Sequence, residues 1–369
     1  VINVDANSLS SGDATTLISS AIAGLNSDDI ESFQILKDGS ATSIYGARAM
    51  AGVIVVTTKK GSPGVTRVNY NGEYTMRLVP SYSEFNIMNS QEQMSVYEEM
   101  YQKGWLNFTS SVYSSSAGVY RKMAQLMNTY DPATGKYMIE NTEEGRKAYL
   151  REAEMRNTDW FKELFRPSVQ HSHSVSITSG SEKGSYYASL GALVDPGWTV
   201  QSKVNRYTAL FNTSQKLFKD YVTLNIIGNA SYRQQRAPGS LSSDVNAATG
   251  SVKRDFDINP YSYALRTSRT LDPNEFYTSN YAPFNIKHEL ANNYIDLSVL
   301  DTKFQAELKA RPCKGLELSA LGSVRYQLSN TEHNIKDSSN QAEAYRAAMT
   351  KMIQNANPFL YKDPDKPTS

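Results

Sequence analysis

The sequence has one cysteine, no long apolar run and almost no net charge. Cys313 alone cannot form an intrachain disulfide or a multi-cysteine metal site. The 38 Lys and Arg residues offset 37 Asp and Glu residues to a net charge of +1, which argues against nucleic-acid binding through a basic face. The run Val53 to Val56 is far shorter than the ~18 apolar residues of a membrane helix. A disulfide scaffold and a helical membrane span are therefore excluded, whereas a membrane β-barrel has this same average composition.

Both ends of the sequence predict a piece of a longer protein. It begins at Val1 without the charged and apolar segments of a signal peptide, and it stops at Ser369 in a polar tail. We therefore expect that the whole protein has further segments on either side.

Residues 1–63 predict a small mixed α/β unit. Ser32 to Leu36 alternates as a short strand, and Val53 to Thr58 is β-branched throughout, as in a strand buried on both faces. Lys37 to Gly52, between these strands, is rich in glycine and alanine. The breaker Gly61-Ser62-Pro63-Gly64 ends the unit. Residues 64–369 are expected to form a second, β-rich domain.

Beyond the breaker, seven segments alternate strictly between apolar and polar residues. In the first of them, Val68, Tyr70 and Tyr74 share one face, and Asn71 and Glu73 share the other. This period of two predicts strands with one apolar and one polar face. The segments are 67–76, 169–178, 186–192, 206–217, 222–232, 300–309 and 316–327.

The connections between these segments alternate between tight and very long. The tight turns fall at 181–184, 218–220 and 311–315. The long loops fall at 80–167, 235–297 and 330–369. Short turns at one end and long loops at the other are typical of an outer-membrane barrel. The alternative is a secreted, β-rich, glycan-binding adhesin, which would not need an α/β unit ahead of its strands.

Tyrosines and loop helices fit the barrel interpretation. Five tyrosines near segment ends would form aromatic girdles: Tyr70, Tyr74, Tyr186, Tyr232 and Tyr326. Within the first long loop, Ser90 with Gln93 has the spacing of a capping box. Asp159 is expected to cap a short helix whose aromatic side chains pack the loop onto the rim of the barrel.

Two stretches resemble a known family. LKDGSATSIYGARAMAGVIVVTTKKG, from Leu36 to Gly61, resembles the plug-domain signature of the SusC/RagA class of TonB-dependent outer-membrane transporters. NTDWFKELFR, from Asn157 to Arg166, and GSEKGSYYASLGAL, from Gly180 to Leu193, resemble the start of that family's barrel. The usual upstream VVDG-like element is present only as Val4-Asp5-Ala6, so that turn departs from the pattern.

The resemblance implies a barrel of about 22 strands that encloses an α/β plug, with about seven strands in this chain. It implies energy-coupled import of a nutrient, typically an oligosaccharide and in some members a peptide, by a protein that is not an enzyme. The implied partners are a SusD-like surface lipoprotein, TonB-ExbB-ExbD reached through a TonB box, and membrane lipid or lipopolysaccharide. The implied location is the outer membrane of a Gram-negative bacterium.

The plug signature supplies the first candidate site residues, which would act in plug structure and gating: Lys37, Asp38, Gly39, Ser40, Ala41, Tyr45, Gly46, Arg48 and Gly52. The small residues allow close backbone approach. Arg48 would be enclosed by the lumen and should bind a carboxylate, with Glu73 and Glu307 as candidates by strand parity. A surface ion pair is the alternative for Arg48.

Ligand contacts are expected in the loops, where Trp105 and Trp198 could stack on sugar rings or peptide side chains. His171 and His173 share one strand face but have no third ligand nearby, so a surface pair is favoured over a metal site. Cys313 is expected in a tight turn without a role. No cofactor, metal or catalytic residues are predicted.

Overall fold

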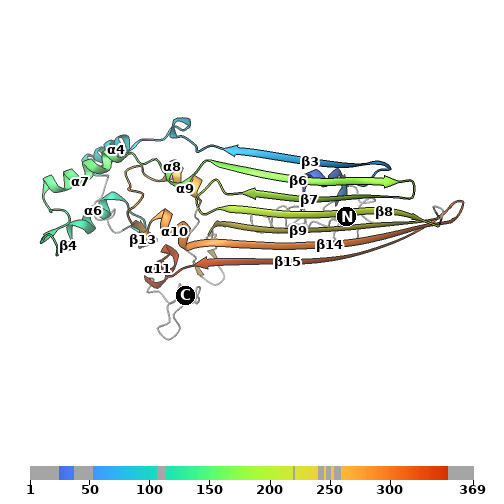
Figure 1. Cartoon of the computed structure of the whole chain (residues 1–369). Coiled ribbons are helices and arrows are strands. Elements are labelled where there is room, and N and C mark those ends of the chain that lie inside the picture. The colour runs from blue at the N-terminus through green and yellow to red at the C-terminus, as the bar shows by residue number, and fades with distance from the viewer. Residues whose placement is uncertain are drawn as a thin grey trace.

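A computed structural model describes residues 25–36, 53–105, 114–218, 221–239, 245–246, 251–252 and 259–347. Its main element is a seven-stranded antiparallel sheet with the order β15-β14-β9-β8-β7-β6-β3. The chain therefore visits neighbouring strands in succession (Figure 1). In this part of the protein the sheet is open, with β3 and β15 at its edges. The strands are β3 (Gly64–Arg77), β6 (Ser168–Ser181), β7 (Gly184–Asp195), β8 (Lys203–Leu217), β9 (Val222–Pro238), β14 (Asn293–Cys313) and β15 (Leu316–Ile335).

All seven predicted strands are confirmed; each is longer than the alternating segment, and three of them extend into ranges that were expected as loops. β9 continues to Pro238, β14 already starts at Asn293 and β15 continues to Ile335. These strand ends enter the ranges expected as loops. Their outward positions carry polar residues such as Gln234 and Asn330, so the apolar–polar alternation stops while backbone pairing continues.

One face of the sheet is apolar over a length that suits a bilayer. Tyr207 pairs with Tyr232 at one end of the band, and Leu217 pairs with Val222 at the other. About eleven residues of each strand separate these two levels, which matches the ~9–11 residues of a transmembrane strand. Large apolar side chains on this face are exposed, for instance Phe304 at 54% and Val324 at 72%. The five tyrosines predicted as girdles all lie on this face.

The α/β unit is represented by a hairpin next to the polar face of the sheet. It consists of η1 (Ser27–Asp29), β1 (Ile30–Leu36) and the antiparallel β2 (Val53–Thr58). The two predicted strands are thus confirmed. Burial of β2 on both faces is wrong where the structure describes it, because Val55 to Thr58 are only half-buried and β1 is the single strand that pairs with β2.

The helices gather at one end of the sheet, opposite the tight turns (Figure 1). They are η4 (Tyr82–Glu84), α4 (Ser90–Gln102), α6 (Val119–Met127), α7 (Glu143–Arg156), α8 (Trp160–Leu164), α9 (Pro260–Arg266), α10 (Ile286–Asn292) and α11 (Asn340–Ala347). Short strand pairs accompany them: β4–β5 (130–131, 136–137), β10–β11 (245–246, 251–252) and β12–β13 (277–279, 282–284). Among the described residues, no helix combines the length and apolarity needed to cross a membrane.

The cap of α4 lies one residue earlier than the sequence predicted. The Asn89 side chain accepts a hydrogen bond from Glu92 N at 2.9 Å, and the Glu92 carboxylate accepts one from Asn89 N at 2.8 Å. Ser90 instead is fully buried and donates from its hydroxyl to the Glu154 carbonyl of α7. The Ser90–Gln93 box is therefore wrong, because the reciprocal hydrogen bonds of the capping box join Asn89 and Glu92.

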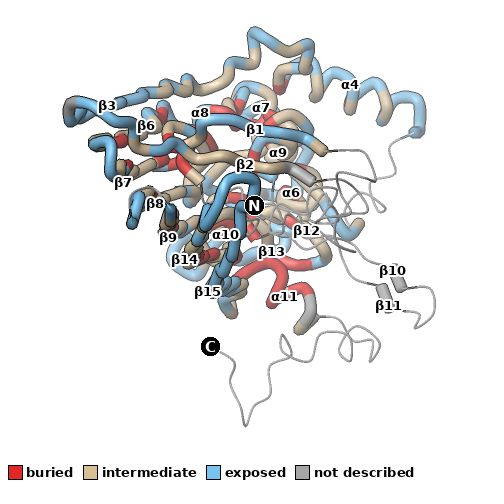
Figure 2. The backbone as a smooth tube through the Cα atoms, turned by 90° about the vertical axis from the view of Figure 1, so that its right-hand side faces the viewer, coloured by how far each residue is buried: buried red, intermediate tan, exposed pale blue. Residues whose placement is uncertain are grey.

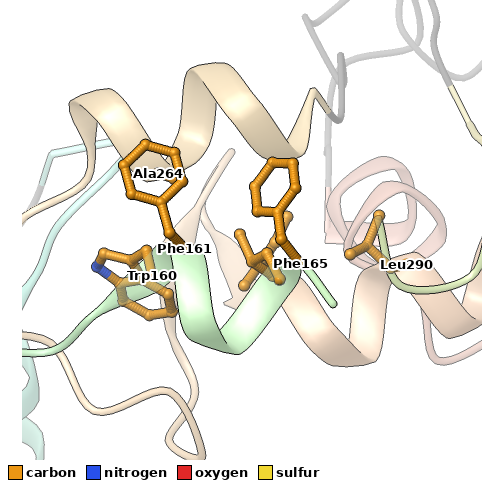
Figure 3. Packing of buried hydrophobic residues seen from close by; sticks show 7 residues of the cluster. Trp160, Phe161, Phe165, Ala264 and Leu290 are labelled. Atoms are coloured by element: carbon orange, nitrogen blue, oxygen red, sulfur yellow. The ribbon is translucent and has the colours of Figure 1, made fainter. Parts of the chain in front are cut away.

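The buried core lies among the loop helices. Asp159 accepts a hydrogen bond from Lys162 N at 3.2 Å, so the predicted cap of α8 is confirmed. Phe161 and Phe165 point from α8 toward α9, with Trp160 and Leu290 beside them (Figure 3). In Figure 2, β3 is exposed along most of its length, whereas the start of α11 is buried. The loops therefore fold as a packed unit on the rim of the sheet.

Candidate functional site

The polar face of the sheet holds the hairpin through hydrogen bonds at η1. Asn71 Nδ2 donates to both carboxylate oxygens of Asp28, at 3.1 and 3.0 Å, and Ser174 Oγ also donates to Asp28. The Tyr187 hydroxyl donates to Asp29 Oδ1 at 2.9 Å. The hairpin therefore contacts β3, β6 and β7 on the face of the sheet opposite the apolar band.

The contact continues on both sides of η1. Asn212 Nδ2 donates to the carbonyl of Lys59, just beyond β2, at 3.1 Å. At Gly191 of β7, an added Cβ would lie 2.6 Å from Thr208 Oγ1 and 2.7 Å from Asn26 Nδ2, so the Asn26 side chain approaches the sheet closely here. The hydrogen bonds from Ser174 and Asn71 hold the pKa of Asp28 below its ordinary value of 3.8. The carboxylate is thus ionised where it meets the sheet.

The predicted gating residues lie outside the described part of the chain, from Lys37 to Gly52. Of the two carboxylates suggested for Arg48, Glu307 accepts a hydrogen bond from Asn225 Nδ2 at 2.9 Å and pairs with Lys309 at 3.3 Å. Glu73 is exposed on β3. Both occupy the polar face, as strand parity predicted, and their pairing with Arg48 stays a prediction.

A pocket of about 440 Å³ lies among the loops. We call it the loop pocket. Its walls come from α4, α6, α8, α9 and the segment that leads through β12 and β13 into α10. Aromatic side chains line it, including Tyr97, Trp160, Tyr263 and Tyr277, together with the guanidinium-bearing Arg266. Aromatic walls with a few polar groups are typical of small-ligand sites.

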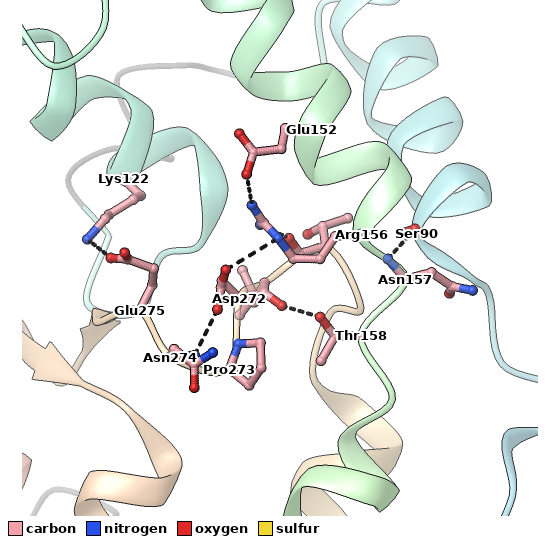
Figure 4. Close-up of polar contacts among 12 residues, drawn as sticks. Ser90, Lys122, Glu152, Arg156, Asn157, Thr158, Asp272, Pro273, Asn274 and Glu275 are labelled. Carbon is pink, nitrogen blue, oxygen red and sulfur yellow. Dashed lines mark hydrogen bonds and ion pairs between the residues drawn. The ribbon is translucent and has the colours of Figure 1, made fainter.

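One wall of the loop pocket is the turn from Asp272 to Glu275, which cations of α6 and α7 hold in place (Figure 4). Lys122 pairs with Glu275 at 2.6 Å. Arg156 donates to the Thr270 carbonyl at 2.7 Å and lies 3.8 Å from the Asp272 carboxylate. The Tyr277 hydroxyl accepts a hydrogen bond from Asp272 N at 2.8 Å. The wall is therefore preorganised by contacts between the two long loops.

Two tyrosine hydroxyls of the loop pocket, those of Tyr263 and Tyr277, stay protonated. Burial raises the pKa of Tyr263 and of Tyr277 above the ordinary value of 10.0. Both groups are therefore neutral at physiological pH and can donate as well as accept hydrogen bonds. This suits ligands that carry hydroxyl groups.

The two tryptophans predicted to contact ligand lie apart from the loop pocket. Trp105 is 70% exposed, with Lys103 Nζ at 4.9 Å from its ring centroid. Trp198 donates from Nε1 to the Leu78 carbonyl at 2.9 Å and packs 4.8 Å from Phe165, ring centroid to ring centroid. Trp160, which the sequence assigned to packing, lines the pocket as well. Sequence reasoning missed the pocket because its walls come from two loops far apart in the chain.

His171 and His173 lie on the apolar face of β6 beside two tyrosines of β3. His173 Nδ1 is 2.6 Å from the Tyr70 hydroxyl, and the His171 and His173 rings lie 5.2 Å apart. Within the described ranges, no group of three or more His, Cys, Asp or Glu side chains could hold a metal ion. Cys313 is exposed at the end of β14, in the tight turn that was expected.

Comparison with known proteins gives a consistent set of relatives. The TonB-dependent receptor SusC of Bacteroides thetaiotaomicron is 30% identical over 211 residues, which is 57% of this chain and 16% of SusC. The TonB-dependent receptor P3 of Formosa agariphila is 26% identical over 204 residues, 55% of this chain and 16% of that protein. The sequence resemblance to the SusC/RagA class is thereby confirmed. No protein-family model matches the chain.

The fold has counterparts among solved structures. The structure of the RagAB peptide importer in the 'open-open' state has a TM-score of 0.58 at 21% identity, over 84% of this chain and 33% of that one. The structure of the 'closed-closed' state has a TM-score of 0.59 and matches over 86% of this chain and 34% of that one. The described sheet is therefore of the RagA/SusC barrel type, and the match spans about a third of those chains.

Proposed function

We propose that this chain, a sequence of the SusC/RagA class, is part of a TonB-dependent transporter that imports an oligosaccharide across the outer membrane of a Gram-negative bacterium. The main support for this proposal is that the sheet has two different faces. One face bears an apolar band of membrane-spanning length, and the other holds an α/β hairpin through Asp28 and Asp29. A wall that separates lipid from a plug needs both properties.

In this proposal each part of the chain has a separate task. The packed loops receive the ligand at the outer end, and the loop pocket supplies aromatic rings and neutral hydroxyls for sugar units. The hairpin and the plug signature close the lumen below. TonB, driven by the proton motive force through ExbB-ExbD, then displaces the plug, while a SusD-like lipoprotein covers the mouth. The named relatives are receptors and importers rather than enzymes, and we propose no catalytic activity, cofactor or metal.

Peptide import is the second candidate, because the solved relatives are named as a peptide importer. A glycan-binding adhesin is disfavoured, because a soluble protein rarely exposes an apolar face as large as this band. The full-length protein should accordingly need detergent or lipid to stay monodisperse, which an adhesin would not.

Growth of a deletion strain tests the function and the ligand class together. A strain that lacks the full-length gene should lose growth on defined oligosaccharides as sole carbon source and regain it on complementation. Unchanged growth on all glycans with lost growth on peptides would favour peptide import. Unchanged growth on both would contradict the transporter proposal.

A further inference from the structure

The loop pocket contains one cation, Arg266, that has no counter-ion among the residues that the structure describes. Arg266 ends α9 and lines the pocket, and its side chain is exposed. Within the described residues its guanidinium makes no hydrogen bond and no ion pair. By contrast, Arg77, Arg236 and Arg325 are each bound to a carboxylate at 2.6 to 2.8 Å. Arg266 is therefore available to a ligand.

The acidic residues of the same pocket do not neutralise Arg266, because each is already engaged. Glu275 pairs with Lys122 at 2.6 Å. Asp272 accepts a hydrogen bond from Asn274 N through Oδ1 at 2.8 Å, and its other carboxylate oxygen faces Arg156 at 3.8 Å. These contacts point the two carboxylates toward protein partners. The free charge that a ligand meets is positive.

The remaining lining is suited to sugars. Tyr97, Tyr263 and Tyr277 provide aromatic surface, and Ser116 and Thr278 add hydroxyl groups. A volume of about 440 Å³ lies within the range of about 300–1,000 Å³ for small-ligand sites. A guanidinium beside such a surface binds an oxyanion through two parallel N–H donors.

We infer that the loop pocket selects oligosaccharides that carry an oxyanion substituent, a uronate carboxylate or a sulfate, and that Arg266 is the residue that binds it. This inference rests on the proposed oligosaccharide import and specifies the substrate class. Neutral glycans leave Arg266 in water and lose one charge-assisted interaction. The expected preference for the anionic ligand is therefore about tenfold.

The test measures binding to the full-length protein in detergent micelles by calorimetry. The probes are an oligogalacturonide and its methyl ester, and a sulfated galactan oligosaccharide and its desulfated form, so that one member of each pair lacks the anionic group. The wild type should prefer the charged member of at least one pair by about tenfold. Arg266→Gln should abolish that preference, and Arg266→Lys should keep part of it. Binding of the charged member should weaken with added salt in the wild type but not in Arg266→Gln.

Arg151→Gln is the matched control. Arg151 lies in α7 outside the pocket, and its ion pair with Glu154 is exposed. Loss of preference in this variant as well would assign the effect to net charge and overturn the inference. Equal binding of both members of each pair, or an unchanged preference in Arg266→Gln, would overturn it while leaving oligosaccharide import intact. Binding of a short peptide but of no glycan would overturn the inference and the oligosaccharide proposal together.

Discussion

Trp160 holds the loops together by filling the centre of their core. Its side chain is 2% exposed, and its Nε1 donates to the Ser268 carbonyl at 3.0 Å. Trp160→Ala should lower the free energy of local loop opening by about 3–5 kcal/mol, because it leaves a cavity and an unpaired carbonyl. Native-state proteolysis within residues 80–167 measures this quantity. Trp105→Ala is the control, because Trp105 is 70% exposed, and a change within about 0.5 kcal/mol is expected.

Glu289 should make the stability of the loop core depend on pH. It is 2% exposed and accepts hydrogen bonds from Asn340 N at 2.6 Å and Asn293 Nδ2 at 3.1 Å. Burial raises the pKa of Glu289 above its ordinary value of 4.5. A raised pKa means that the folded state binds the proton more tightly. The contribution of protonated Glu289 to the stability of the loop core is therefore complete below pH 4.5. It is lost as the pH rises through the folded-state pKa of Glu289.

Hydrogen exchange checks this prediction at α11, because the backbone N–H of its first residue, Asn340, donates a hydrogen bond to Glu289. Protection of the α11 amides, corrected for intrinsic exchange rates, should fall in the wild type as the pH rises above the ordinary Glu pKa of 4.5. Glu289→Gln cannot titrate and should remove this slope. His288 and His333 lie near, and a slope that persists in Glu289→Gln would assign the pH dependence to them instead.

At the scale of elements, substitutions in β14 can test which face of the sheet contacts lipid. Phe304 lies midway along the apolar band, opposite Gly228 and Val324, and is 54% exposed. Phe304→Arg should destabilise the barrel by about 2–4 kcal/mol, because it introduces a charge near the bilayer midplane. Folding into lipid vesicles, followed by heat-modifiable gel mobility, measures the loss. Gln305→Arg, one residue along on the polar face, should fold like the wild type, and equal defects in the two variants would contradict the assignment of the faces.

The strands were predictable from the sequence, whereas the loop pocket was not. A strand with lipid on one side and a polar lumen on the other must alternate, as Phe304 and Gln305 do, so a period of two marks each strand. The pattern stops where the strand leaves the apolar band, which is why the ends of β9 and β15 were underestimated. The loop pocket depends on Tyr97 of one long loop meeting Tyr277 of another. No periodicity within either loop encodes that contact.

At the scale of the whole molecule, the hairpin is attached to the sheet by few groups. Asp28 and Asp29 carry three of the four partners identified on the strands, and both lie in the short η1. Hydrogen bonds of this kind can be exchanged for hydrogen bonds to water when the hairpin is displaced. This is the property that a plug moved by TonB would need.

Removing both carboxylates should therefore loosen the plug while the barrel still folds. In Asp28→Ala/Asp29→Ala, Asn71, Ser174 and Tyr187 lose their acceptors, each worth about 0.5–3 kcal/mol. Cells with the full-length variant should admit a large hydrophilic antibiotic that the wild type excludes, with equal amounts of protein in the outer membrane. Glu31→Ala, at an exposed position of β1, is the control and should exclude the antibiotic.

Arg48→Ala should also let the antibiotic pass if Arg48 binds a carboxylate of the wall. Full exclusion by the double variant together with leakage in Arg48→Ala would move the main attachment from η1 to the plug signature.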